Sequence, residues 1–296
     1  MTAVEPMALP TLSRSTVDRD GATRDDPAAL AAAWDGAQVL VLDEQGQALV
    51  DGTELVLVDA TDAPDGDRLY LGRDGSTPFF TVVGELPRRL GARPMGLRDV
   101  GAALSDRDAG LLVHAVGLST WHRTHPHCPR CGAPTTSVRG GSVRRCTADG
   151  TDHFPRTDPA IIVLVTDGAD RAVLGRQQVW PERRFSTLAG FVEPGESAEH
   201  AVVREVHEES AVHVRDVVYR GSQPWPFPAS LMLGYRAVCD PDSVPVPLDG
   251  ELAEVRWFTR DQLRDAGGWS GGSGEVLLPP PVSIAHRLIT EWTAEG

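Results

Sequence analysis

The chain has few cysteines and no long apolar run. None of its apolar stretches approaches the roughly 20 residues that a helix needs to span a bilayer, so we expect no membrane-spanning helix. The first 26 residues also lack the apolar centre of a signal peptide. With no export signal and only four cysteines, the sequence predicts a cytoplasmic protein without disulfides.

Basic charge is also scarce. The chain has 28 Lys and Arg against 42 Asp and Glu, which gives a formal net charge of −14. Such a surface repels polyanions, so coating of nucleic acid over the whole surface is excluded, whereas a nucleotide could still be drawn in locally by metal ions. The length of 296 residues, with 41% hydrophobic and 24% charged residues, is typical of a soluble globular protein with room for two domains.

The pattern of apolar residues predicts β-rich segments on both sides of a cysteine-containing insert. Residues 37–83 alternate short β-rich runs with Asp, Gly and Pro clusters, which predicts an antiparallel sheet or a small barrel. One or two helices are expected over 97–121, followed by the Cys/His-rich insert. No strong internal repeat is visible. Further strands and a closing amphipathic helix are predicted at 160–165, 217–221, 230–239, 255–258 and 283–292.

The segment GFVEPGESAEHAVVREVHEESAV, residues 190–212, is the most informative part of the chain about function. Its acidic, basic and glycine residues follow the spacing G-x5-E-x7-R-E-x-x-E-E and are Gly190, Glu196, Arg204, Glu205, Glu208 and Glu209. A helix places the last three glutamates on one face, where their charges repel and a divalent cation such as Mg²⁺ relieves the repulsion. The alternative is a solvated acidic helix with a few ion pairs.

Two features favour the metal-site interpretation. Glu196 and Arg204 are eight residues apart, roughly two helical turns, so their side chains can hold the preceding loop against the helix. That loop contains Gly190 and Gly195 with Pro194 between them, as a sharp turn near a ligand requires.

The insert contains a partial zinc-ribbon pattern. Cys128 and Cys131 form a C-x2-C pair, and Cys146 supplies a third thiolate, but Asp149 stands where a fourth cysteine is expected. The fourth zinc ligand is therefore left open between Asp149, His153, His125 and His127. The alternative is a reduced loop without metal. Cys239 lies in a predicted strand far from the insert, and we expect it in the core.

A second motif, SQPWPFPAS, occupies residues 222–230. Its alternating prolines fix the backbone, so Trp225 and Phe227 can be presented on a rigid loop to a planar ring. Gln223 and Ser230 offer hydrogen bonds to ribose or phosphate. Taken alone, the motif is more typical of a rigid turn whose aromatic side chains pack into the core.

The two motifs together resemble the NADH pyrophosphatase branch of the Nudix hydrolases. Residues 190–212 resemble the Nudix box, SQPWPFPAS matches the string SQPWPFPxS of this branch, and the closing LLPPP at 277–281 with its helix fits as well. Ala211 departs from the box, which has glycine there, and we expect a slightly different exit from the helix. The three-cysteine insert departs from the four-cysteine ribbon of the family.

The resemblance implies a set of site residues. The metal ligands for Mg²⁺ or Mn²⁺ would be Glu205, Glu208, Glu209, Glu251 and the carbonyl of Ala189, with Arg204 and Glu196 supporting the loop. Either Glu209 or Glu251 would accept the proton of the attacking water. The substrate contacts implied are Gln223, Pro224, Trp225, Pro226, Phe227, Pro228, Ala229, Ser230, Phe154, Phe191, Glu251 and Ala285.

The implied fold is α+β, with a β-rich N-terminal domain at 1–121, a zinc-ribbon-like segment at 122–156 and a Nudix α/β/α sandwich at 157–296. The implied activity is hydrolysis of NADH, and less well of NAD⁺, to the nicotinamide mononucleotide and AMP, with removal of NAD caps from RNA, in a homodimer.

Two alternatives stay open. They are a Nudix hydrolase of another substrate, such as ADP-ribose or a dinucleoside polyphosphate, and a non-catalytic zinc-ribbon module that binds nucleic acid or protein.

Overall fold

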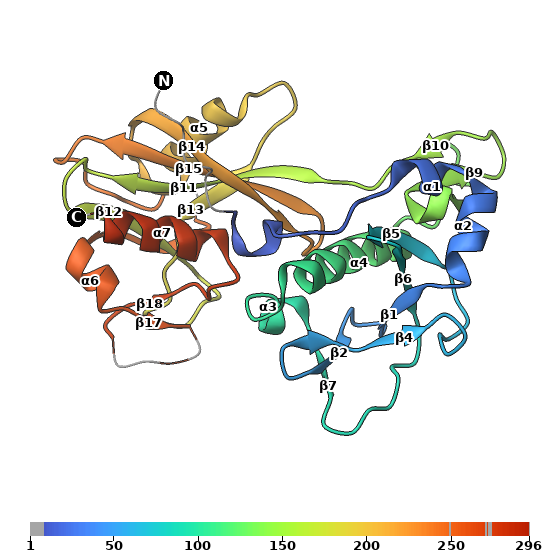
Figure 1. Cartoon of the computed structure of the whole chain (residues 1–296). Helices are drawn as coiled ribbons and strands as arrows, with labels where there is room; N and C mark the ends of the chain where they lie inside the picture. The colour runs from blue at the N-terminus through green and yellow to red at the C-terminus, as the bar shows by residue number, and fades with distance from the viewer. Residues whose placement is uncertain (1–8, 249, 270, 272–273, 296) are drawn as a thin grey trace, which may run out of the picture. The chain divides into compact units, whose positions relative to one another are not determined.

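The computed structural model describes residues 9–248, 250–269, 271 and 274–295 and divides the chain into two compact units (Figure 1). The N-terminal unit consists of Leu12–Thr157 and, from later in the chain, Trp225–Ala229. The C-terminal unit contains Asp158–Pro224 and Ser230–Gly296, together with Met1–Thr11. Among the described helices, none combines the length and the apolar character needed to cross a membrane.

The C-terminal unit is built around a six-stranded sheet of order β14-β15-β11-β12-β16, with β13 paired to β11. The predicted strands and the closing helix are confirmed. The elements are β11 (Asp158–Thr166), β12 (Arg171–Gln177), β13 (Leu188–Phe191), α5 (Ala198–Ser210), β14 (Val214–Trp225), β15 (Ser230–Cys239), β16 (Leu252–Thr259), α6 (Arg260–Arg264), β17 (Gly267–Gly268), β18 (Leu277–Leu278) and α7 (Ile284–Ala294).

Strand β11 is the centre of this unit and is buried on both faces. Ile161 belongs to the core cluster that contains Val206 of α5, and Ile162 belongs to the cluster that contains Ile289 of α7. Successive side chains of a strand point to opposite faces, so a continuous apolar run such as AIIVLV requires cover on both sides. The two helices supply this cover and complete the α/β/α sandwich, and each buried aliphatic side chain contributes about 1.5–3 kcal/mol.

The N-terminal unit contains a seven-stranded sheet of order β3-β2-β1-β6-β5, with β4 paired to β1 and β7 paired to β2. The expectation of an antiparallel sheet was wrong at one place, because β1 and β6 run parallel. The elements are α1 (Gly21–Asp25), α2 (Pro27–Trp34), β1 (Gln38–Leu42), β2 (Ala48–Asp51), β3 (Glu54–Leu55), β4 (Leu57–Asp59), β5 (Leu69–Asp74), β6 (Thr77–Val83), β7 (Arg93–Met95), α3 (Leu97–Val100) and α4 (Asp106–Thr124).

The two units share one topology although the sequence shows no repeat. Strand β1 pairs antiparallel with β2 and β4 and parallel with β6, as β11 pairs antiparallel with β12 and β13 and parallel with β15. Strand β7 then pairs with β2 as β16 pairs with β12. The units differ between the third and fourth corresponding strands. The C-terminal unit places α5 between β13 and β14, whereas residues 60–68 connect β4 to β5 without a helix. The N-terminal unit therefore lacks a counterpart of the glutamate-bearing helix.

The cysteine-containing insert forms a small three-stranded sheet within the N-terminal unit. Its strands β8 (Thr135–Val138), β9 (Val143–Cys146) and β10 (Asp152–His153) are antiparallel, and the short helix η2 (Arg139–Gly141) joins β8 to β9. A Cβ at Gly140 would lie 2.8 Å from Cβ of Tyr70, so only glycine permits this close approach of the insert to the N-terminal sheet.

Helix α5 begins and ends with defined caps. The Ser197 side chain accepts a hydrogen bond from the backbone N–H of His200, and the N–H of Ala211 donates to the carbonyl of His207. The expectation of a different helix exit at Ala211 was wrong, because its φ of 60° is the left-handed conformation that glycine would supply. An L-residue carries a steric cost of roughly 1–2 kcal/mol in that conformation. The sandwich packing around α5 holds the backbone there nevertheless.

Replacing this alanine with glycine is expected to stabilise the protein. Ala211→Gly should raise the free energy of unfolding by about 1 kcal/mol, because the relief of left-handed strain exceeds the added entropy of the unfolded chain. Urea denaturation would measure the change. The control Ala31→Gly, at an exposed right-handed position of α2, should lower the stability by about 1 kcal/mol. A loss of stability in both variants would contradict the assignment of strain to Ala211.

Candidate active site

Arg204 is the hub of the candidate site on α5. Its guanidinium donates to both carboxylate oxygens of Glu196, at 2.9 and 2.8 Å, and to the carbonyl of Phe191 at 2.9 Å. The predicted ion pair between Glu196 and Arg204 is thus formed. The same guanidinium reaches Glu205 and Glu208, each at 2.9 Å. One planar side chain therefore fixes the loop before α5 to the helix that carries the glutamates.

The charges around Arg204 shift the protonation of its partners. Hydrogen bonding from Arg204, followed by the backbone N–H of Glu193, lowers the pKa of Glu196 to about 2. For Glu205 the direction is opposite. Burial raises the pKa of its carboxyl, and the charges of Glu208 and Glu251 add to this effect against the opposing Arg204. A carboxylate that is both desolvated and crowded by like charges is where a cation lowers the energy most.

The backbone around Gly190 is shaped to receive the glutamates. A Cβ built on Gly190 would lie 1.9 Å from Cδ of Glu205, so only glycine leaves room for this carboxyl. Glu209 is 5% exposed, and one of its oxygens accepts a hydrogen bond from the N–H of Ala189 at 3.2 Å. The structure thus brings Glu205 and Glu209 to the β13 segment around Ala189.

The donor set fits a hard divalent cation. Glu205 and Glu209 converge on β13, and Glu251 lies near enough for its charge to act on Glu205. Glu208 is half-exposed at the same end of α5 and shares Arg204 with Glu205. Carboxylate and carbonyl oxygens are the ligands that Mg²⁺ and Mn²⁺ prefer.

The SQPWPFPAS motif is divided between the units. It covers the end of β14, a turn and the start of β15, and Trp225–Ala229 belongs to the N-terminal unit. Gln223 lies in the core with no exposed surface, and its amide donates to the carbonyl of Val282 at 3.1 Å. Its side chain therefore ties β14 to the segment before α7. Pro226 and Ser230 are also buried, whereas Trp225, Phe227 and Ala229 are partly exposed and Pro228 is exposed.

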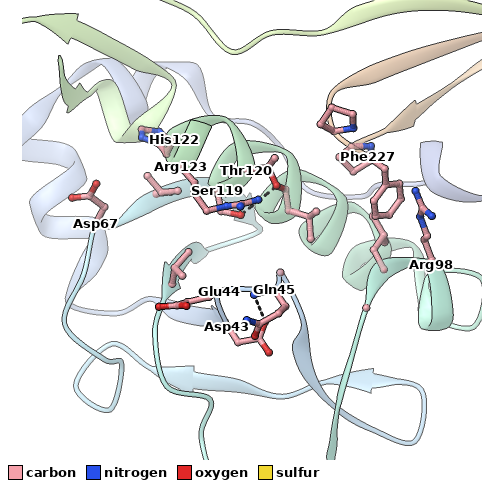
Figure 2. A pocket seen from close by; sticks show the side chains of 18 of the residues that line it. Asp43, Glu44, Gln45, Asp67, Arg98, Ser119, Thr120, His122, Arg123 and Phe227 are labelled. Carbon is pink, nitrogen blue, oxygen red and sulfur yellow. Dashed lines mark hydrogen bonds between the residues drawn. The ribbon is translucent and has the colours of Figure 1, made fainter. Parts of the chain in front are cut away.

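The aromatic rings of this loop are held by a residue that the sequence did not indicate. The guanidinium carbon of Arg98, in α3, lies 4.2 Å from the ring centre of Phe227 and 5.5 Å from that of Trp225. The two rings meet edge to face at 5.0 Å. Figure 2 shows Arg98 and Phe227 beside each other on the wall of a cavity of about 1230 Å³ within the N-terminal unit. No sequence signal identifies Arg98, because its partners are more than 120 residues away in the chain.

The remaining predicted contact residues have different surroundings. Phe154 and Phe191 are 62% and 57% exposed, which leaves both rings available to a ligand. Ala285, in the first turn of α7, is buried in the core.

The cysteine insert gathers a second group of ligands. The ligand atoms of Cys128, Cys131, Cys146 and Asp149 all lie within 4.8 Å of one another. His153 approaches the group at one corner, with Nε2 3.2 Å from Sγ of Cys128. Burial acts to raise the pKa of the Cys128 thiol, but hydrogen bonds from Arg130, Cys131 and His153 outweigh it and lower the pKa to about 7. This is a zinc-ribbon site. Cys239 is in the core, as expected, with its thiol near the carbonyl of Thr166.

Comparison with known proteins agrees with this architecture. Residues 27–121 match the NADH pyrophosphatase-like rudimentary NUDIX domain, 123–154 the NADH pyrophosphatase zinc ribbon domain and 156–277 the NUDIX domain. Proteins of Mycobacterium bovis (strain BCG / Pasteur 1173P2) and Mycobacterium tuberculosis (strain ATCC 25618 / H37Rv), both described as NAD-capped RNA hydrolase NudC, are 44% identical over 97% of this chain and 96% of their own length.

A protein of Deinococcus radiodurans with the same description is 41% identical over 81% of this chain and 85% of its own length. The chain therefore belongs to the NADH pyrophosphatase branch of the Nudix hydrolases.

The depressed pKa of Glu196 predicts a specific response to acid. Because the folded value of about 2 lies below the ordinary value of 4.5, the ion pair with Arg204 stabilises the fold fully above pH 4.5 and loses this effect as the pH falls toward 2. Wild type should therefore be more stable than Glu196→Gln at neutral pH, and the difference should shrink below pH 4.5. Denaturant titrations between pH 7 and 2 measure it. A difference that stays constant with pH would rule out this linkage.

Proposed function

We propose that this protein hydrolyses the diphosphate of NADH, and less well of NAD⁺, to the nicotinamide mononucleotide and AMP, and removes NAD caps from RNA. The observation that carries the proposal is the convergence of Glu205 and Glu209 on the β13 backbone, with Arg204 fixing the loop. The relatives described as NAD-capped RNA hydrolases support the choice of substrate.

Three roles in the reaction would fall to residues of this chain: metal binding, positioning of the loop and acceptance of a proton. Glu205, Glu208, Glu209, Glu251 and the carbonyl of Ala189 would hold Mg²⁺ or Mn²⁺. The bound ions would neutralise the diphosphate and make a water more acidic. The ion pair between Arg204 and Glu196 holds the loop in a fixed position against the helix. The proton of the attacking water passes to a carboxylate, either Glu209, which the Ala189 N–H orients, or the more exposed Glu251.

The motif loop would supply recognition of the nucleotide. Trp225 and Phe227 are partly exposed and are held by Arg98, so their rings lose little freedom when a planar base or nicotinamide binds. The exposed Phe154 and Phe191 are further candidates for contact with a ring. Gln223 and Ala285 would shape the site from the core rather than by an exposed surface.

The first test is product analysis with NADH and NAD⁺, with and without Mg²⁺ or Mn²⁺. Metal-dependent appearance of AMP and reduced nicotinamide mononucleotide would support the proposal. Cleavage of ADP-ribose or of a dinucleoside polyphosphate instead would keep the diphosphate chemistry and reject the substrate. An absence of turnover with all of these compounds would favour a binding module.

One variant tests the carboxylate chemistry. Glu209→Gln should lower kcat by about two orders of magnitude or more, because the amide neither binds the metal as an anion nor accepts a proton. The matched control is Glu199→Gln, at an exposed position in the first turn of the same helix, which should retain wild-type activity. Circular dichroism checks that both variants fold. Activity of Glu209→Gln within tenfold of wild type would remove this residue from the mechanism.

In the zinc ribbon, we propose Asp149 as the fourth ligand. Its carboxylate shares the 4.8 Å group with the three thiols, and the N–H of Thr151 orients it at 2.9 Å. A site of three thiolates and one carboxylate is closed, which indicates a structural zinc rather than a catalytic one. His153 would then act from outside by hydrogen bonding to the Cys128 sulfur.

Zinc measurements on two variants separate these roles. The purified protein should contain about one zinc ion per chain. Asp149→Ala should weaken zinc retention against a competing chelator by at least about tenfold, and by more than His153→Ala does. Metal analysis after chelator titration gives the comparison. Greater loss in His153→Ala would make the histidine the ligand.

We also propose a homodimer in the cytoplasm. The reducing cytoplasm suits the free thiols at Cys128, Cys131 and Cys146. Sedimentation measurements would give the oligomeric state directly.

A further inference from the structure

A second cavity in the N-terminal unit has an unusual excess of positive charge. It encloses about 720 Å³, and four arginines, Arg24, Arg68, Arg139 and Arg145, line it against one carboxylate, Asp25. This volume is within the range of ordinary small-molecule pockets, roughly 300–1,000 Å³. A local concentration of arginines is unexpected in a chain whose net charge is −14.

The arginines come from three separate parts of the sequence. Arg24 belongs to α1, Arg68 directly precedes β5, and Arg139 and Arg145 belong to the zinc-ribbon segment at η2 and β9. Helix α1, helix α2 and strand β5 all pack against η2, and Figure 1 shows α1 and α2 beside the ribbon strands. The cavity therefore exists only because the ribbon folds against the N-terminal sheet.

Two of the four arginines have their charge satisfied by the protein. Arg139 pairs with Asp25 through two hydrogen bonds of 2.8 and 2.6 Å, and Arg145 pairs with Asp152 through two of 2.6 and 3.0 Å. These carboxylates hold two guanidinium groups in fixed orientations on one wall of the cavity.

The other two arginines lack such a partner. In the described part of the chain, neither Arg24 nor Arg68 forms a salt bridge, and the buried Nε of Arg24 has no hydrogen-bond acceptor. A buried donor without an acceptor destabilises the folded chain, and an anion in the cavity would offset the unsatisfied charge of this guanidinium. The guanidinium carbon of Arg68 lies over the ring of Trp34, 4.0 Å from its centre, and the side chain is otherwise exposed, so it is available to a ligand.

We propose that this cavity, defined by Arg24, Arg68, Arg139 and Arg145, binds the phosphate backbone of single-stranded RNA. Arginine forks match phosphate oxygens, and guanidinium planes stack on unpaired bases, so the combination fits a nucleotide chain better than an isolated anion. The proposal rests on the proposed removal of NAD caps, since it explains how an acidic enzyme holds the RNA attached to the cap.

Binding of uncapped RNA tests the proposal without requiring turnover. The probe is a fluorescent 5′-monophosphate RNA of about ten nucleotides, a length within the ordinary site sizes of single-strand binders, and anisotropy gives its Kd. Arg68→Ala changes an exposed side chain and should not disturb folding. It should weaken binding about threefold to tenfold and reduce the salt dependence of log K by about 0.7. Arg24→Ala should do the same.

The control is Arg215→Ala, which removes the same charge from an exposed arginine of the C-terminal unit and should leave the Kd unchanged. Arg68→Lys should retain most of the salt dependence. Equal weakening by Arg215→Ala and Arg68→Ala, or no weakening by either cavity variant, would overturn the proposal. Binding of inorganic phosphate but not of RNA would replace RNA with a small phosphate ligand and also overturn it.

Hydrolysis of free NADH and of NAD-capped RNA distinguishes this failure from failure of the proposed function. If both proposals hold, Arg68→Ala lowers kcat/KM for capped RNA about threefold to tenfold and leaves that for NADH unchanged. An equal loss on the two substrates would contradict a separate RNA site. If wild type hydrolyses neither substrate while the cavity variants still lose RNA affinity, only the proposed function fails.

Discussion

The candidate active site depends on one guanidinium. Arg204 joins Glu196 in the loop, the carbonyl of Phe191 at the end of β13, and Glu205 and Glu208 on α5. Without a cation of this shape, three glutamates within two turns would repel each other and the glycine-containing loop would have no fixed position. Arg204 neutralises part of this charge while leaving Glu205 and Glu209 directed at the β13 backbone. Partial compensation of the charge thus keeps this acidic site folded and leaves the carboxylates that, under the proposed function, would hold a divalent ion.

The shared topology of the two units explains what the N-terminal unit can and cannot do. Its strands repeat the pairings of the C-terminal sheet, but residues 60–68 replace the helix that would carry glutamates. Without this helix, the N-terminal unit has two other features that bear on ligand binding. Arg98 holds the rings of Trp225 and Phe227, and the packed zinc ribbon closes the arginine-lined cavity. Under the two proposals, the N-terminal unit would contribute to recognition through Trp225 and Phe227, which Arg98 holds, and through the arginines of the cavity.

Local sequence was a reliable guide where a signal is confined to one element. Glu196 and Arg204 meet because their spacing is set by one helix and its loop, and Cys128 and Cys131 lie together because two residues separate them. It was a poor guide to the parallel pairing of β1 with β6, since antiparallel and parallel strands share the same composition in short runs. The left-handed Ala211 was missed because the surrounding packing overrides the local preference of alanine.

The sequence by itself determined the chemical class of the site: the glutamate spacing requires a helix, and the SQPWPFPAS string and the cysteine pair are local motifs. Only the tertiary structure decided which of these side chains are buried and which lie together. Gln223 turned inward to Val282, Asp149 joined the three thiols, and Arg24, Arg68 and Arg139 met at one cavity. The physical reason is that burial and charge pairing depend on residues brought together across long sequence separations. No local pattern specifies which polar group finds its partner within the protein and which remains available to a ligand.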